Sequence, residues 1–229
     1  MKFLLIIISI LISFTLLSGR PECSGSTTKV SKVLILGNSI TIKSPAPALG
    51  WYNNWGMAAT APDSDYVHRL IFKMKAKNPN IEVNYGSIAT DFERTFWNVN
   101  YKDKEFASFK DFNADLIIIR IGDNINDNLA NEDSLGIHLS ELVNYVSSNR
   151  NVNVCMTSSF FWPRKNINRI IDSLCTANNW TFVNLNGLFQ DPANTSYDRF
   201  TNRGVGAHPS DAGMRNIADR IWQNISKFF

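Results

Sequence analysis

A serine and a histidine, far apart in this sequence of 229 residues, are the side chains best suited to catalysis. Ser39 follows the apolar run 33–36 and the pair Gly37 and Asn38, whereas His208 precedes Pro209 near the carboxyl terminus. A hydroxyl at the carboxyl end of a buried strand lies where open α/β sheets bind their ligands. An imidazole that accepts the hydroxyl proton would let the serine oxygen attack an acyl carbon. The two residues therefore predict a serine hydrolase.

Strand-like and helix-like segments alternate along the chain, and this alternation predicts how the two side chains meet. Five apolar runs, most of them rich in Val and Ile, are predicted strands: 33–36, 81–85, 116–121, 152–157 and 181–185. Segments with apolar residues at helical spacing are 66–77, 93–109, 135–148, 166–178 and 211–228. Such a chain favours an α/β fold with three layers, α/β/α, around a five-stranded parallel sheet. We expect the Ser39 oxygen within roughly 3–4 Å of an imidazole nitrogen of His208.

The first 24 residues have the character of a secretory signal peptide. A lysine at position 2 is followed by the apolar run 4–17 and then by small residues, and this run is too short to cross a membrane comfortably. We expect export to the periplasm, the cell envelope or the medium, and a single domain over residues 25–229 without a stable membrane span. Lipid attachment at Cys23 is the alternative, but Glu22 before it favours simple cleavage.

Composition excludes several classes of protein. The chain is 44% hydrophobic and 19% charged, which is ordinary for a globular protein and not for a disordered or polytopic membrane protein. The net charge of +3 includes Lys2 and Arg20 of the signal region, and no basic cluster predicts nucleic-acid binding. Cys155 and Cys175 could form a disulfide, but two buried thiols are the preferred interpretation. The scattered histidines and the lack of a phosphate-binding loop predict neither a metal nor an organic cofactor.

Two sequence blocks around these residues resemble those of the GDSL-type, or SGNH, hydrolase family. Gly37-Asn38-Ser39 stands where that family has Gly-Asp-Ser-Leu after its first strand, which implies that Ser39 is the nucleophile. His208-Pro209 matches the end of the family's Asp-x-x-His-Pro block, which implies that His208 is the base. The resemblance also implies the family's flavodoxin-like fold.

Two further blocks, in the family's order, imply an oxyanion hole. The stretch 84–89 resembles the block that contributes a glycine N–H, with Ala89 at the matching position. Gly122-Asp123-Asn124 resembles the Gly-x-Asn block, whose asparagine side chain donates a hydrogen bond. The N–H groups of Ser39 and Ala89 and the side chain of Asn124 are thus the expected donors. Gly86 and Asn126 remain alternatives.

The sequence departs from the family at the acid of the triad, because Val205 occupies the aspartate position. Three explanations are open. A main-chain carbonyl within 204–206 could orient the imidazole, Asp191 or Asp198 could replace the missing acid, or the enzyme could be weak. The carbonyl is our first expectation. Asp211 is predicted to take part in capping the final helix instead.

The long segment 41–62 after the first strand holds Trp51 and Trp55, which either contact the substrate or only pack locally. The family resemblance implies an exported esterase that removes an acyl group, acetyl first, from a carbohydrate or a related small ester. A glycan-binding protein with little or no catalytic activity is the alternative that Val205 and Ala89 suggest. A lipase or lysophospholipase is the third, although no distinctive acyl-binding segment is visible.

Overall fold

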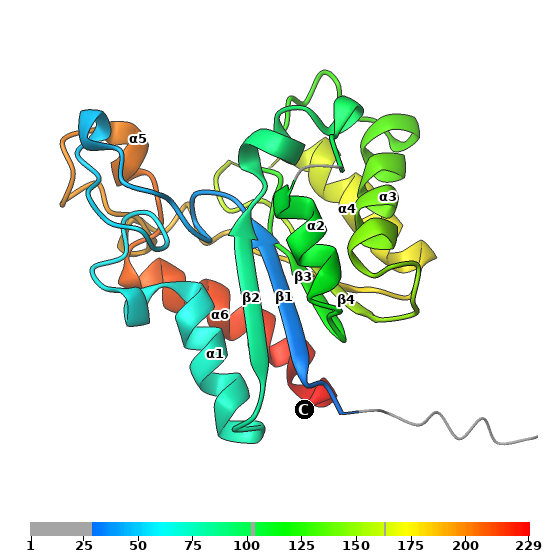
Figure 1. Ribbon diagram of the computed structural model, residues 1–229. Helices are drawn as coiled ribbons and strands as arrows, with labels where there is room; N and C mark the ends of the chain where they lie inside the picture. The colour runs from blue at the N-terminus through cyan, green and yellow to red at the C-terminus, as the bar shows by residue number, and fades with distance from the viewer. Residues whose placement is uncertain (1–28, 102–103, 163) are drawn as a thin grey trace, which may run out of the picture.

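A five-stranded parallel sheet forms the centre of the computed structural model, which describes residues 29–101, 104–162 and 164–229 (Figure 1). The strand order is β2-β1-β3-β4-β5. The strands are β1 (Lys32–Gly37), β2 (Glu82–Ser87), β3 (Leu116–Ile119), β4 (Asn153–Thr157) and β5 (Thr181–Val183). The predicted α/β fold class is confirmed. The predicted signal peptide and Cys23 lie outside the described residues, and no helix within the described ranges could span a membrane.

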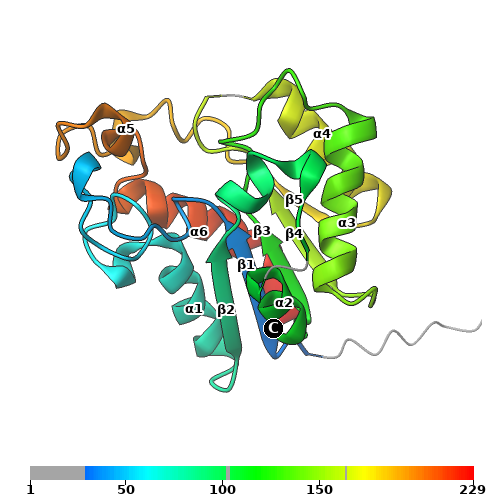
Figure 2. The ribbon, with the colours of Figure 1, turned by 45° about the horizontal axis from the view of Figure 1, so that its top comes forward.

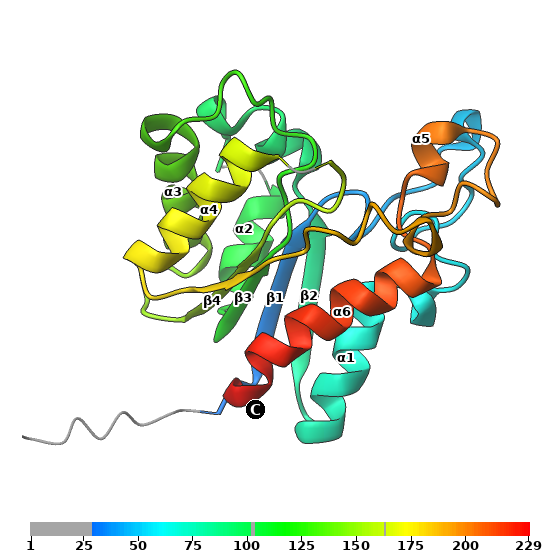
Figure 3. The ribbon, with the colours of Figure 1, turned by 180° about the vertical axis from the view of Figure 1, so that it is seen from behind.

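Helices cover both faces of the sheet. One face carries α1 (Tyr66–Lys77) and α6 (Asp211–Ile225), seen in front of the sheet in Figure 3. The other carries α2 (Lys104–Asp111), α3 (Ile137–Val146) and α4 (Lys165–Ala177), which are on the near side in Figure 2. In β1, Val33 and Ile35 point to the first face and Leu34 and Leu36 to the second. A strand that is buried on both faces needs apolar residues in succession, which explains the run in the sequence.

The first strand lies at a topological switch point. It pairs in parallel with β2 on one side and with β3 on the other, so the chain leaves its carboxyl end in one direction and later returns on the opposite side. A crevice forms at such a point, outside the carboxyl ends of the strands. Ser39 lies two residues beyond the end of β1 and therefore stands at this crevice.

The predicted helix over 93–109 is wrong for most of its length. The chain instead forms a π turn at Ala89–Glu93 and a 3-10 turn at Phe96–Asn98, and α2 begins only at Lys104. Glu93 is fully buried and accepts hydrogen bonds from residues on other segments. These contacts with distant parts of the chain fix its backbone, and helical spacing in the sequence does not reveal them.

Two long segments pack together beyond the carboxyl end of the sheet. Residues 43–60 and 195–207 share a small apolar cluster, and the second segment contains the short helix α5 (Arg203–Gly206) (Figure 1). The cluster consists of Trp51, Met57, Ala58 and Val205, with Ala46, Trp55 and Phe200 packed against it. We call these two segments the active-site lobe, because the first follows Ser39 and the second leads to His208.

The two cysteines in the described part of the chain are separate, buried thiols. Cys155 packs in the core on the α1 and α6 side of the sheet, whereas Cys175 packs in the core on the other side. The preferred interpretation of these residues as small buried hydrophobes is confirmed.

Candidate active site

The fold brings Ser39 and His208 into hydrogen-bond contact, with 2.8 Å between the serine Oγ and the imidazole Nε2. A tight turn after β1 presents the serine, since the N–H groups of Thr41 and Ile42 donate to the carbonyl of Asn38. Gly37 makes this turn possible, because a Cβ there would meet the Thr41 Oγ1 at 1.9 Å. The expected separation of 3–4 Å or less is therefore met.

A main-chain carbonyl holds the other side of the imidazole. The Nδ1 of His208 lies 2.8 Å from the carbonyl oxygen of Gly204, so Nδ1 donates its proton and Nε2 is left to accept from the serine. Gly204 belongs to α5, which Asn202 caps by accepting from the N–H groups of Gly204 and Val205. The expected type of partner, a carbonyl within 204–206, is the one present.

The aspartates proposed as substitutes do not contact the ring. Asp191 caps the turn at Pro192–Asn194 by accepting from the N–H of Ala193, and Asp198 is exposed. Ser210 is the N-cap of α6, and Asp211 follows in its first turn, where it accepts two hydrogen bonds from Thr60. None of these carboxylates takes the place of the missing acid.

Val205, at the position of the missing acid, packs into the interior of the active-site lobe. Its side chain is only 1% exposed and packs in the apolar cluster of the active-site lobe, with Trp51, Met57 and Ala58. A carboxylate at this position would lie among apolar side chains and lose its hydration. The position that supplies the acid in the resembled family therefore serves the packing of the lobe here.

Burial sets the basicity of the imidazole. It lowers the pKa of His208 to about 4, and the nearby guanidinium of Arg120 acts in the same direction. The hydrogen bond to Gly204 and the charge of Asp123 oppose this shift without cancelling it. The ring is therefore neutral at neutral pH, which is the form that can accept the serine proton.

The expected oxyanion donors come from three segments around Ser39. In the described part of the chain, no hydrogen bond uses the N–H of Ser39. Ala89 begins the π turn, and its neighbour Ile88 donates to the carbonyl of Gly37, which places this turn beside the end of β1. Ala89 is not among the residues with positive φ, so alanine fits the backbone there.

The alternative donors have other roles. Gly86 lies inside β2, where a Cβ would meet the ring of Phe109 at 2.4 Å, so its small size serves packing. Asn126 is exposed, and its side-chain oxygen accepts from the N–H of Asn128 in a turn. Asn124 is half-buried, and its side-chain nitrogen donates to Glu93 over 2.7 Å. The geometry favours Asn124 over Asn126 as the side-chain donor.

A buried charged network lies beneath these donors, and the sequence analysis missed it. Arg120 pairs with Asp123 over 2.7 Å and also donates to the side chain of Asn38, which in turn donates to Glu93 and Asp123. Burial raises the pKa of Glu93, as does the charge of Asp123. An arginine inside the apolar run 116–121 was the available signal, because a buried guanidinium requires acidic partners.

Of the two interpretations of Trp51, substrate contact and local packing, its burial supports local packing. Trp51 is 1% exposed and its indole N–H donates to the carbonyl of Lys43, while Trp55 is half-buried and donates to Ala59. Their rings pack edge to face at 6.0 Å. Both residues stabilise the active-site lobe.

A different aromatic group lies beside the imidazole. The ring of Phe161 packs edge to face on the imidazole of His208, with 5.2 Å between the ring centroids. Phe189 lies next to both Phe161 and Trp162, with centroid distances of 5.8 Å and 5.0 Å. Trp162 is 59% exposed. We call Phe161, Trp162 and Phe189 the aromatic shelf. The signal in the sequence was the run of aromatics at 160–162, which follows the predicted strand 152–157 after two serines.

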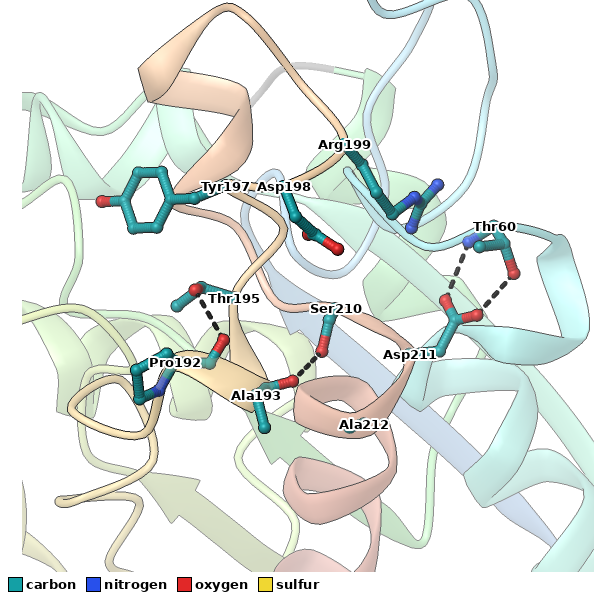
Figure 4. Close-up of a pocket in the computed structure, with 10 residues that line it drawn as sticks. All are labelled: Thr60, Pro192, Ala193, Thr195, Tyr197, Asp198, Arg199, Ser210, Asp211 and Ala212. Atoms are coloured by element: carbon teal, nitrogen blue, oxygen red, sulfur yellow. Dashed lines mark hydrogen bonds between the residues drawn. The ribbon is translucent and has the colours of Figure 1, made fainter.

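A cavity of about 400 Å³ lies under the second segment of the lobe, and Figure 4 shows its lining. Several of its polar groups form hydrogen bonds between the segments that line it. Thr60 donates to Asp211, and Ser210 donates to the carbonyl of Ala193. Neither Ser39 nor His208 lines it. Within the described ranges, no group of three or more potential metal ligands is present.

Comparison with known proteins gives a likeness of fold. No family model matches the sequence, and no curated protein matches it either. A two-domain esterase active on acetylated mannans, crystallised with mannopentaose, aligns with a TM-score of 0.57 and 18% identity over 86% of this chain. This chain spans 49% of that esterase.

Two further solved structures align with this chain over almost their whole length. A member of the lipolytic G-D-S-L family from Veillonella parvula aligns with a TM-score of 0.53 and 12% identity, over 86% of this chain and 98% of that one. An extracellular lipase from Streptomyces rimosus aligns with a TM-score of 0.53 and 13% identity, over 85% of this chain and 99% of the lipase. The chain thus has the fold of the GDSL-type hydrolases that its sequence blocks resemble.

Proposed function

We propose that this chain, folded as a GDSL-type hydrolase, is an exported serine esterase that removes acetyl or other short acyl groups from carbohydrates or related small esters. One observation carries the proposal. The Oγ of Ser39 lies 2.8 Å from the Nε2 of His208, while the Gly204 carbonyl holds Nδ1. A hydroxyl, a neutral imidazole and a fixed tautomer are the requirements for general-base activation of a serine.

In the acylation step, Nε2 of His208 takes the proton of Ser39 as Oγ attacks the ester carbonyl carbon. The carbonyl oxygen becomes an oxyanion, which accepts hydrogen bonds from the N–H groups of Ser39 and Ala89 and from the side chain of Asn124. The imidazolium then gives its proton to the departing alcohol. The acyl group is now bound to Oγ of Ser39. A water molecule, deprotonated by the same imidazole, attacks the acyl carbon. The bond to Oγ then breaks, the imidazolium returns the proton to Oγ, and the free acid leaves.

The dyad works without a carboxylate on the imidazole. The Gly204 carbonyl fixes the tautomer, but it carries only a partial charge and stabilises the imidazolium less than an aspartate would. The charge of Asp123 raises the pKa of His208 from a greater distance and supplies part of this stabilisation. We therefore expect turnover with a modest kcat.

The aromatic shelf supports a carbohydrate ester as the substrate. It begins at Phe161 against the catalytic imidazole and ends at the exposed face of Trp162, so a bulky alcohol leaving group could lie along it. A rigid aromatic ring can cover the apolar face of a sugar ring at little cost in conformational entropy. The activity of the mannan esterase with the same fold favours the same class of substrate.

A glycan-binding protein without turnover is the second candidate, and the missing acid at Val205 is the observation that favours it. Hydrolysis of p-nitrophenyl acetate, butyrate and octanoate by residues 25–229 separates the two. We expect acetate to be preferred, and the Ser39→Ala variant to lose about 10³-fold or more of kcat. Equal rates of ester hydrolysis for parent and variant, with unchanged melting temperatures, would exclude the proposed esterase activity of Ser39. Calorimetry with manno-oligosaccharides would then test binding alone.

A further inference from the structure

Glu93 is a carboxylate without access to solvent, placed directly beneath the expected oxyanion site. It ends the π turn that begins at Ala89, and its side chain points toward the turn after β3. The esterase mechanism gives it no step. A buried carboxylate costs several kcal/mol of hydration, so it persists only where its partners compensate.

Four hydrogen bonds meet at this carboxylate. Its Oε1 accepts from the N–H of Gly122 at 2.7 Å, from the N–H of Asn124 at 3.4 Å and from the side-chain nitrogen of Asn38 at 3.3 Å. Its Oε2 accepts from Nδ2 of Asn124 at 2.7 Å. Glu93 thus binds both the backbone and the side chain of the Gly-x-Asn turn. It also binds Asn38, the residue before the nucleophile.

The bond to Oε2 determines how the Asn124 amide is turned. An amide group has two N–H donors on one side and an oxygen acceptor on the other. When one N–H is held by an anion, the nitrogen cannot exchange places with the oxygen, and the second N–H is left for another acceptor. A carboxamide that could flip would present its oxygen to the oxyanion for part of the time, and this contact is repulsive.

We propose that Glu93 is a positioning residue of the oxyanion hole, which fixes the Asn124 amide with one N–H on Oε2 and the other toward the oxyanion. The inference rests on the proposed esterase mechanism. Burial and the charge of Asp123 raise the pKa of Glu93, whereas the hydrogen bonds from Asn124 and Gly122 and the charge of Arg120 oppose this shift. The ionised form can accept all four hydrogen bonds.

The Glu93→Gln variant tests this role with the smallest possible change. Its oxygen can still accept from the N–H groups of Gly122 and Asn124, while its new NH₂ group faces the NH₂ group of Asn124. We expect kcat for p-nitrophenyl acetate to fall about 10- to 100-fold with KM within about 2-fold, because a misplaced donor costs up to the full value of an oxyanion contact.

A double-mutant comparison distinguishes positioning from a general structural effect. If Glu93 acts through Asn124, adding Glu93→Gln to Asn124→Ala should lower kcat no further than Asn124→Ala alone. The matched control is Asp115→Asn, which changes a carboxylate that accepts three hydrogen bonds from Ser31 and Lys32 at the opposite end of the sheet. That variant should keep the parental kcat.

Independent losses that multiply in the double variant, or an unchanged kcat in a folded Glu93→Gln variant, would overturn the proposal. A measurement on the unmodified chain covers the case in which Glu93→Gln does not fold or the parent shows no Ser39-dependent turnover. In ¹⁵N spectra, assigned with the Asn124→Ala variant, one side-chain proton of Asn124 should be shifted downfield and the amide should rotate slowly. Ordinary chemical shifts and rapid rotation of the Asn124 amide would show that Glu93 does not fix it, whatever the esterase activity.

Discussion

At the scale of single residues, the surroundings of His208 determine the pH range in which the dyad can act. Its pKa is lowered to about 4 by burial, against an ordinary value of about 6.5. The neutral base is therefore present from about pH 5 upward. We expect kcat/KM for p-nitrophenyl acetate to stay level down to about pH 5 and to fall through about pH 4, because kcat/KM reports the free enzyme. A fall centred near pH 6.5 would show a solvated imidazole.

The same pKa has a consequence for stability. The unfolded chain binds a proton on this histidine below about pH 6.5, whereas the folded chain does so only below about 4. The contribution of His208 to the free energy of unfolding is thus fully present above about pH 6.5. It is lost progressively as the pH falls from there toward 4.

An aspartate in place of Val205 would restore the family's triad in the sequence but not in the structure. In the Val205→Asp variant the carboxylate would lie in the apolar cluster with Trp51 and Met57. We expect the melting temperature to fall by several degrees and kcat not to rise, because burying an unpaired charge is costly. Val205→Ala is the control for lost packing alone. A gain in kcat at an unchanged melting temperature would show that the aspartate reaches the imidazole.

Residue types in a pattern predicted part of this site. Ser39 stood out because it follows an apolar run typical of a buried strand, and His208 because the sequence has only 3 histidines. The order of the blocks placed the two residues at one edge. The role of Trp51 stayed open, because the sequence does not tell whether an aromatic side chain in a loop faces solvent or packs inward. Glu93 was missed because its partners come from three separate segments.

At the scale of elements, the segment after β4 offers a test of the substrate class. Trp162→Ala removes the exposed end of the aromatic shelf. We expect KM for an acetylated manno-oligosaccharide to rise about 10-fold, with kinetics on p-nitrophenyl acetate nearly unchanged, since only the larger substrate reaches this ring. Phe72→Ala on α1, where the ring is 76% exposed, is the matched control and should change neither. Equal effects on both substrates would remove the shelf as a glycan subsite.

The elements also show where sequence periodicity succeeds. The boundaries of α1 agree with the predicted helix over 66–77, because its apolar face packs on the sheet at regular intervals. The segment 93–109 also has apolar residues at helical spacing, yet Phe92, Glu93 and Phe96 enter the interior through turns. Long-range contacts override local preference there.

At the scale of the whole molecule, the parallel topology explains how residues 169 positions apart meet. All five strands end at the same edge, so the segments after β1, β2 and β3 converge there with the lobe that leads into α6. The two ends of the described chain meet elsewhere, where the N–H of Val30 donates to the carbonyl of Phe228. Strand and helix alternation in the sequence was enough to predict this architecture.

In the proposed mechanism His208, held by a carbonyl alone, activates Ser39 as a nucleophile. Covalent labelling with a fluorophosphonate tests it most directly, since this reagent phosphonylates an activated serine and needs no knowledge of the natural substrate. We predict that residues 25–229 gain one label, that peptide mass spectrometry assigns it to Ser39, and that His208→Ala slows labelling at least about 100-fold. Labelling of Ser39 at the same rate in His208→Ala, or no labelling of Ser39 in the folded parent, would show that His208 does not activate this serine.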